Sequence, residues 1–245
     1  MIPLPKNSHI LADAGAVART AAERLGSLCR ATPDRPIAVC LSGGSTPKRL
    51  YTLLAGAAHR ETLPWDRLHW FFGDDRHVPW DDAVSNVRMA REAFSGAPIP
   101  PGNVHGMPMS HALAADAAAY EAELKAFYGA ETLDPERPLF DLVLLGLGED
   151  GHTASLFPGK PAVEETRAWV SPVPEAGLDP FVPRLTLTFP VLASARSVLM
   201  LVTGEAKRAP LQRLADGEDL PAARIAGPVT WLVDRAAADA HSASA

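Results

Sequence analysis

The sequence predicts an α/β fold built on a parallel β-sheet, and three observations support this. First, residues 140–145 form an almost unbroken apolar run, which is typical of a central strand that is buried on both faces. Second, further short apolar runs alternate with alanine-rich segments that have helical spacing. Third, several of these runs lead directly into polar residues, and open α/β sheets bind their ligands at the carboxyl ends of strands.

Length and composition predict one domain over residues 1–245, with 47% hydrophobic residues available for a core. The net charge of −6 argues against nucleic acid or an anionic membrane as a partner. No stretch approaches the ~20 apolar residues of a membrane span, and the first residues do not resemble a secretion signal. We therefore expect a cytoplasmic protein in which Cys29 and Cys40 are buried, reduced thiols.

Periodicity and turn residues predict the other elements. Helices are expected over residues 11–30, 86–94, 112–128 and 204–214, and a short one from residue 235. Strands are expected over residues 37–41, 68–72, 103–107, 169–173, 184–188, 197–202 and 229–233. Ser85 is the expected cap of the helix at 86–94, and the alternating residues 184–188 predict a strand with one wetter face.

A glycine-rich turn follows the strand at residues 37–41. It consists of Ser42, Gly43, Gly44, Ser45 and Thr46. Thr46 is the predicted N-cap of a helix with Pro47 at its first position, and the free backbone N–H groups at such a helix start suit a phosphate. An ordinary βα turn explains the residues equally well, because the spacing is not that of a Walker motif.

Residues 146–155 combine glycines, carboxylates and a histidine directly after the central strand. The glycine spacing matches that of a dinucleotide site, but two carboxylates would face the pyrophosphate and residues 157–159 interrupt the helix that should follow. We reject that interpretation. His152 and Asp150 instead favour acid–base chemistry, because a neutral imidazole can take a proton from water near pH 7. A purely structural histidine is the alternative.

Two other kinds of chemistry are not expected. The remaining histidines lack the spacing of metal ligands, so we predict no metal. The sequence has no nucleophile elbow, so neither Ser42 nor Ser155 is expected to act as a covalent nucleophile.

Five segments resemble 6-phosphogluconolactonases in content and in order. They are residues 42–47 (SGGSTP), 72–78 (FGDDRHV), 146–155 (GLGEDGHTAS), 184–188 (RLTLT) and 204–208 (GEAKR). The resemblance implies a doubly wound, mostly parallel sheet with helices on both faces, shared with glucosamine-6-phosphate deaminases. It also implies a hydrolase of the oxidative pentose phosphate pathway that acts on a small sugar phosphate lactone and needs no cofactor.

The resemblance assigns three residues to catalysis. His152 would be the general base that activates water, Asp150 would orient it, and Arg76 would be the cation near the reacting end or the sugar hydroxyls. Asp74 is assigned to the substrate, although it could equally be a structural partner of Arg76.

The resemblance places the phosphate on the turn at residues 42–46, with positive charge from Arg184 and Lys207. From the residues alone, a surface charge would be the preferred interpretation of Arg184, and a solvated helix face that of Lys207.

Two alternative functions stay open. A sugar-phosphate deaminase or isomerase could use the same fold. Such deaminases have Asn-Glu-Pro where this sequence has Leu156-Phe157-Pro158, and usually a tyrosine at the position of Arg76, so we expect no deamination. A non-catalytic sugar-phosphate sensor is the second alternative, which the absence of a basic DNA-binding segment weakens.

Overall fold

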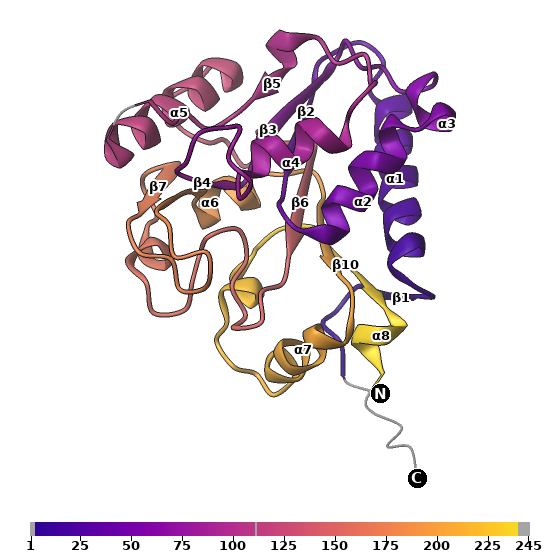
Figure 1. The fold of residues 1–245 in the computed structure, drawn as a ribbon, viewed down its shortest axis with the longest axis vertical. Coiled ribbons are helices and arrows are strands. Elements are labelled where there is room, and N and C mark those ends of the chain that lie inside the picture. Colours follow the sequence, from indigo (N-terminus) through magenta and orange to yellow (C-terminus); the bar gives the residue numbers. More distant parts are fainter. Residues whose placement is uncertain (1–2, 111, 240–245) are drawn as a thin grey trace.

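The computed structural model describes residues 3–110 and 112–239, which form two β-sheets flanked by helices (Figure 1). In the larger sheet, neighbouring strands are parallel and follow the order β1-β10-β9-β6-β2-β3-β5. The strands are β1 (Ser8–Leu11), β2 (Ile37–Leu41), β3 (Leu68–Phe72), β5 (Val104–His105), β6 (Leu142–Gly146), β9 (Val198–Val202) and β10 (Val229–Asp234). The apolar run expected to be the central strand, β6, is the middle one of this order.

Helices cover both faces of the larger sheet. They are α1 (Ala14–Ala31), α2 (Ser45–Ala55), α3 (Ala57–Arg60), α4 (Asn86–Ala93), α5 (Leu113–Tyr128), α6 (Phe189–Ala193), α7 (Arg208–Ala215) and α8 (Arg235–Ala238). Figure 1 shows α1 and α2 on one side of the sheet and α5 on the other. The predicted doubly wound, mostly parallel fold is therefore confirmed. Among the residues that the structure describes, no helix is both long and apolar enough to span a membrane.

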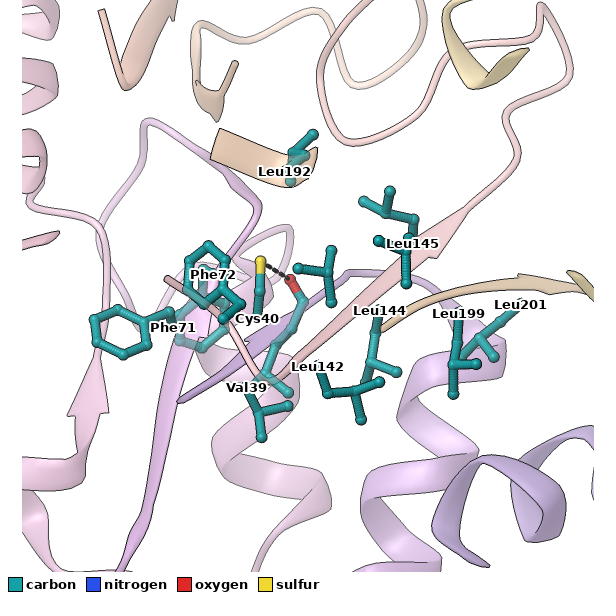
Figure 2. Close-up of a cluster of buried hydrophobic side chains, with 14 of the residues drawn as sticks. Val39, Cys40, Phe71, Phe72, Leu142, Leu144, Leu145, Leu192, Leu199 and Leu201 are labelled. Atoms are coloured by element: carbon teal, nitrogen blue, oxygen red, sulfur yellow. Dashed lines mark hydrogen bonds between the residues drawn. The ribbon is translucent and has the colours of Figure 1, made fainter. Parts of the chain in front are cut away.

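The core lies on both faces of the central strands (Figure 2). Leu144 and Leu145 are neighbours in β6, yet they point to opposite faces of the sheet and both are buried. This two-sided burial explains why the central strands are continuous apolar runs rather than alternating ones. Cys29 and Cys40 are free and buried, as expected, and burial raises the pKa of the Cys29 thiol to about 11.

A second, antiparallel sheet in the order β4-β8-β7 consists of β4 (Asp74–Arg76), β8 (Arg184–Leu187) and β7 (Val170–Val173). The prediction that the strand at 184–188 has one wetter face is wrong, because all four residues of β8 are buried. Thr186 stays satisfied there, since its hydroxyl donates to the Leu187 carbonyl and accepts from the Ser155 amide.

Of the two predicted helix caps, the one at α4 is present and the one at α2 is not. The Ser85 cap is confirmed, because its hydroxyl accepts a hydrogen bond from the Arg88 amide at 3.3 Å. The Thr46 cap is wrong: α2 begins at Ser45, and its N-cap is Gly44 with φ of 101°. Only glycine adopts this left-handed conformation readily, so the turn enters the helix two residues earlier than the Thr-Pro pattern suggests.

Candidate active site

A pocket of about 420 Å³ opens at the carboxyl ends of the central strands, where the larger sheet meets the smaller one. Eight of the predicted site residues line it: Ser42, Gly43, Gly44, Asp74, Arg76, His152, Arg184 and Lys207. Asp150 reaches the pocket through His152, while Ser45 and Thr46 are not among the lining residues. Segments that are far apart in the sequence thus meet at one place, as expected for strand ends of an open α/β sheet.

His152 and Asp150 form a hydrogen-bonded pair at the pocket. The Nδ1 atom of His152 lies 2.6 Å from Oδ1 of Asp150, and the His152 amide donates to the same oxygen at 3.0 Å. Partial burial by itself would raise the pKa of the Asp150 carboxyl, but the hydrogen bonds from His152 outweigh it and the pKa lies below its usual value. With Nδ1 engaged by a carboxylate, Nε2 is the ring nitrogen left for proton exchange.

Glycines make room for this histidine. A Cβ atom on Gly148 would lie 2.0 Å from Nδ1 of His152, so no other residue fits without moving the ring. The Gly148 amide also donates to the His152 carbonyl at 2.8 Å. Gly151 has φ of 90° and packs against Leu220. The glycine spacing that resembles a dinucleotide site therefore serves a tight loop that presents the imidazole.

Two arginines lie opposite each other beside the pocket. Arg76 of β4 and Arg184 of β8 are directly paired in the antiparallel register. Arg76 donates from Nη1 to the Val84 carbonyl at 2.5 Å, and Arg184 donates from Nη2 to the Pro180 carbonyl at 2.9 Å. Burial lowers the pKa of Arg184, which Asp74 partly offsets, but a guanidinium remains protonated at pH 7. Both residues are therefore fixed cations.

These arginines keep unused donors. The Nε atoms of Arg76 and Arg184 are buried, and neither has a hydrogen-bond partner in the part of the chain that the structure describes. Buried polar groups are normally paired, so these two unpaired donors are unusual, and both belong to residues that line the pocket.

The two neighbouring carboxylates of β4 have different partners. Oδ2 of Asp74 accepts from the Ser155 hydroxyl at 2.5 Å, and no ion pair joins Asp74 to Arg76 among the described residues. Asp75 accepts from the amides of Arg76 and Asn86 at 2.7 and 2.6 Å, which fixes the start of α4. Burial raises the pKa of Asp75 to about 6. The first carboxylate thus faces the pocket, and the second one holds the structure around it.

The glycine turn and Lys207 also line the pocket. The Ser42 amide and carbonyl both bond to the Tyr51 hydroxyl, at 3.0 and 2.9 Å, so the turn is anchored to α2. The Thr46 hydroxyl lies 2.5 Å from that of Thr203. Lys207 closes a short 3₁₀ helix, η3 (Glu205–Lys207), that precedes α7. The predicted helix over residues 204–214 therefore begins with a tighter turn.

The sequence did not predict a site role for several residues that line the pocket, among them Asn86, Leu178 and Asp179. Asn86 lies next to Gly43, where a Cβ atom would come within 2.1 Å of its side-chain oxygen. The Ser-Asn pair at the start of α4 was a usable signal, since the predicted cap placed Asn86 at a helix start. For Leu178 and Asp179, no local pattern distinguishes a pocket residue from another loop residue. Phe157 also lines the pocket, and only the comparison with the deaminase motif drew attention to it.

Across residues 3–110 and 112–239, no group of three or more His, Cys, Asp and Glu side chains is placed to hold a metal ion. The absence of a metal cofactor stays a prediction.

The geometry can be compared with known proteins. The model of the family "Glucosamine-6-phosphate isomerases/6-phosphogluconolactonase" matches residues 12–232. The chain belongs to this family. Among its relatives, the 6-phosphogluconolactonase of Synechocystis sp. is 43% identical over 82% of this chain and 83% of its own length. That of Rattus norvegicus is 37% identical over 91% of this chain and 87% of its own. The predicted resemblance is confirmed.

Solved structures of the glucosamine-6-phosphate isomerase/6-phosphogluconolactonase family have the same fold. The 6-phosphogluconolactonase of Thermotoga maritima aligns with a TM-score of 0.79 at 33% identity, covering 93% of this chain and 99% of its own. That of Leishmania guyanensis aligns with a TM-score of 0.84 at 29% identity, covering 98% and 100%. A monomeric glucosamine-6-phosphate deaminase, 20% identical, aligns with a TM-score of 0.80 over 95% of this chain and 98% of its own, which shows the shared fold alone.

Proposed function

We propose that the protein hydrolyses 6-phospho-D-glucono-1,5-lactone to 6-phospho-D-gluconate, as a cytoplasmic enzyme of the oxidative pentose phosphate pathway. The hydrogen-bonded pair of His152 and Asp150 at a pocket with fixed cations is the observation that carries this proposal. The names of the relatives supply the substrate. Two free, buried cysteines fit a reducing compartment.

The reaction needs a base, an oxyanion site and an acid, because a lactone is a cyclic ester. Nε2 of His152 takes a proton from water as the water oxygen adds to the lactone carbonyl carbon. Arg76 stabilises the oxyanion that forms there. When the bond between this carbon and the ring oxygen breaks, the imidazolium returns the proton to the ring oxygen. Asp150 holds the ring in position throughout and stabilises its protonated form.

Substrate binding follows from the charges along the pocket. The phosphate lies at the glycine turn, where the first amides of α2 lack partners within the helix, and Lys207 adds a positive charge. Ser45 and Thr46 contribute through these backbone amides rather than through their side chains. Asp74 accepts a sugar hydroxyl, and Arg184, the cross-strand neighbour of Arg76, adds positive charge for the phosphate together with Lys207.

Deamination of glucosamine 6-phosphate is the alternative on this fold. The surroundings of His152 argue against it, since the neighbouring ring is Phe157, which cannot carry a proton. The fixed cations of Arg76 and Arg184 would also repel a substrate that carries its own ammonium group.

The test compares acid release from freshly made lactone with the spontaneous rate, with and without a chelator. We expect acceleration that the chelator does not change. A lactone rate equal to the spontaneous one would refute the proposal. A parallel incubation with glucosamine 6-phosphate measures ammonia and fructose 6-phosphate. Catalytic release of either product, abolished by His152→Ala, would establish the deaminase instead.

A further inference from the structure

A buried carboxylate outside the pocket is bonded to the turn that carries Lys207. Asp234 is the last residue of β10 and is 4% exposed. Its two carboxylate oxygens accept from the Gly204 amide at 3.0 and 3.2 Å, and Oδ1 also accepts from the Ala237 amide at 2.9 Å. One side chain therefore joins the start of α8 to the Gly204 turn.

Gly204 is in turn hydrogen-bonded to Lys207. The Gly204 carbonyl accepts from the Lys207 amide at 3.1 Å, and Gly204 has φ of 92°, a conformation that favours glycine. The adjacent Thr203 hydroxyl lies 2.5 Å from the Thr46 hydroxyl of α2. Asp234 thus binds the Gly204 turn through its backbone amide. Thr203 joins the same turn to Thr46, which belongs to the glycine-rich turn assigned to the phosphate.

We propose that Asp234 is a positioning residue that fixes Lys207 for the phosphate of the substrate, an inference that rests on the proposed function. Capping a helix requires only one acceptor, and Asp13 caps α1 in that way by accepting from the Ala16 amide at 2.7 Å. Asp234 caps α8 and in addition binds the Gly204 amide with both oxygens. A charge-assisted bond of this kind restricts the turn more strongly than a neutral one does.

The experiment measures the affinity for inorganic phosphate by calorimetry and the steady-state kinetics with the lactone. Asp234→Asn should raise both the Kd for phosphate and the KM by about tenfold, since Lys207 is displaced, and should change kcat by less than about twofold. Gly204→Ala should have the same effect, because it strains the turn while leaving Asp234 in place and a Cβ atom there meets no neighbour within 4 Å. Asp13→Asn is the matched control, and it should leave both constants unchanged.

A double-mutant cycle separates positioning from a merely structural role. If Asp234 acts through Lys207, then adding Asp234→Asn to Lys207→Ala should not weaken phosphate binding further. The inference would be overturned if the double variant showed the product of the two single-variant increases in the Kd for phosphate. An unchanged phosphate affinity in both Asp234→Asn and Gly204→Ala would overturn it as well. Failure of wild-type protein to bind phosphate would overturn it too. Phosphate binding without lactone hydrolysis would instead refute the proposed function and leave the positioning role standing.

Discussion

The phenyl ring of Phe157 packs against the imidazole of His152, with ring centroids 4.6 Å apart and planes inclined by 44°. The guanidinium carbon of Arg184 lies 5.4 Å from the centroid of the same phenyl ring. Phe157 is 1% exposed, and Gly177 packs against it so closely that a Cβ atom there would come within 2.8 Å. The ring is therefore a rigid contact of both the proposed base and one of the cations.

Replacing Phe157 should impair catalysis more than stability explains. Phe157→Leu should lower kcat by about tenfold, because the imidazole loses the surface that holds its orientation. Phe140 is equally buried in the core but does not line the pocket, so Phe140→Leu is the matched control. Both variants should lose about 1–2 kcal/mol of unfolding free energy. Equal kcat values in the two variants would contradict a role of Phe157 in orienting the base.

Removal of the imidazole should abolish most of the activity. His152→Ala should lower kcat by roughly 10²–10⁴-fold, the range typical of losing a general base, with little change in the circular dichroism spectrum. His105 offers a control, since its Nδ1 atom lies 2.7 Å from Glu123 in a similar pair that does not line the pocket. His105→Ala should retain kcat. A loss of less than about tenfold in His152→Ala would leave this histidine with a structural role.

The hydrogen bonds to Asp150 should make its contribution to stability depend on pH. Because its folded-state pKa lies below the unfolded value, Asp150 stabilises the fold above an unfolded pKa of about 4, and this stabilisation is lost as the pH falls through the folded pKa. In urea titrations, wild type should be more stable than Asp150→Asn at pH 7, and the difference should shrink below about pH 4. The exposed neighbour Glu149 is the control, and Glu149→Gln should change stability little at either pH. An advantage of wild type that grows toward acid pH would contradict this sign.

A single methyl group at Gly148 should displace the base. The added Cβ atom in Gly148→Ala would lie 2.0 Å from Nδ1 of His152, the atom that bonds to Asp150, so the imidazole must shift from its present position. We expect a loss of kcat that approaches that of His152→Ala. Gly102→Ala is the matched control, because no atom lies within 4 Å of a Cβ there and activity should persist. Full activity of Gly148→Ala would show that the imidazole tolerates displacement.

The strands of the larger sheet were predictable where burial acts on consecutive residues. The predicted bounds of β2 (Ile37–Leu41) and β3 (Leu68–Phe72) are those of the structure, because a strand that is covered on both faces must be apolar at nearly every position. β1 (Ser8–Leu11) was not predicted, because it is a short edge strand whose residues are mostly exposed or half-buried.

The smaller sheet could not be predicted from local patterns. β4 (Asp74–Arg76) is three charged residues, and it is a strand only because it pairs with β8 more than 100 positions later. The alternating polar residues of β8 predicted a wetter face, because the sequence around them does not show their hydrogen-bond partners. The partner of Thr186, for example, is the amide of Ser155. Pairing of this kind is a property of the assembled fold rather than of the sequence window.

The site shows the same division. Asp150 and His152 are two residues apart, so a short motif is enough to predict that they lie together, and the structure has them hydrogen-bonded. Asp234 contacts Gly204 and Phe157 contacts Arg184, and no short motif records contacts between residues so far apart in the chain. The resemblance to a family supplied the assignments of Arg184 and Lys207, which residue patterns alone did not favour.

The register that sets Arg76 opposite Arg184 has a consequence for how the protein behaves in solution. Like charges that face each other across an antiparallel pair destabilise a sheet, and Arg184 is too deeply buried for water to screen its charge well. An anion held between the two guanidinium groups would relieve this repulsion, and it would bind the folded chain rather than the unfolded one. We therefore expect the melting temperature to depend on the buffer, and the protein to be more heat-resistant in phosphate or sulfate than in a salt whose anion binds weakly.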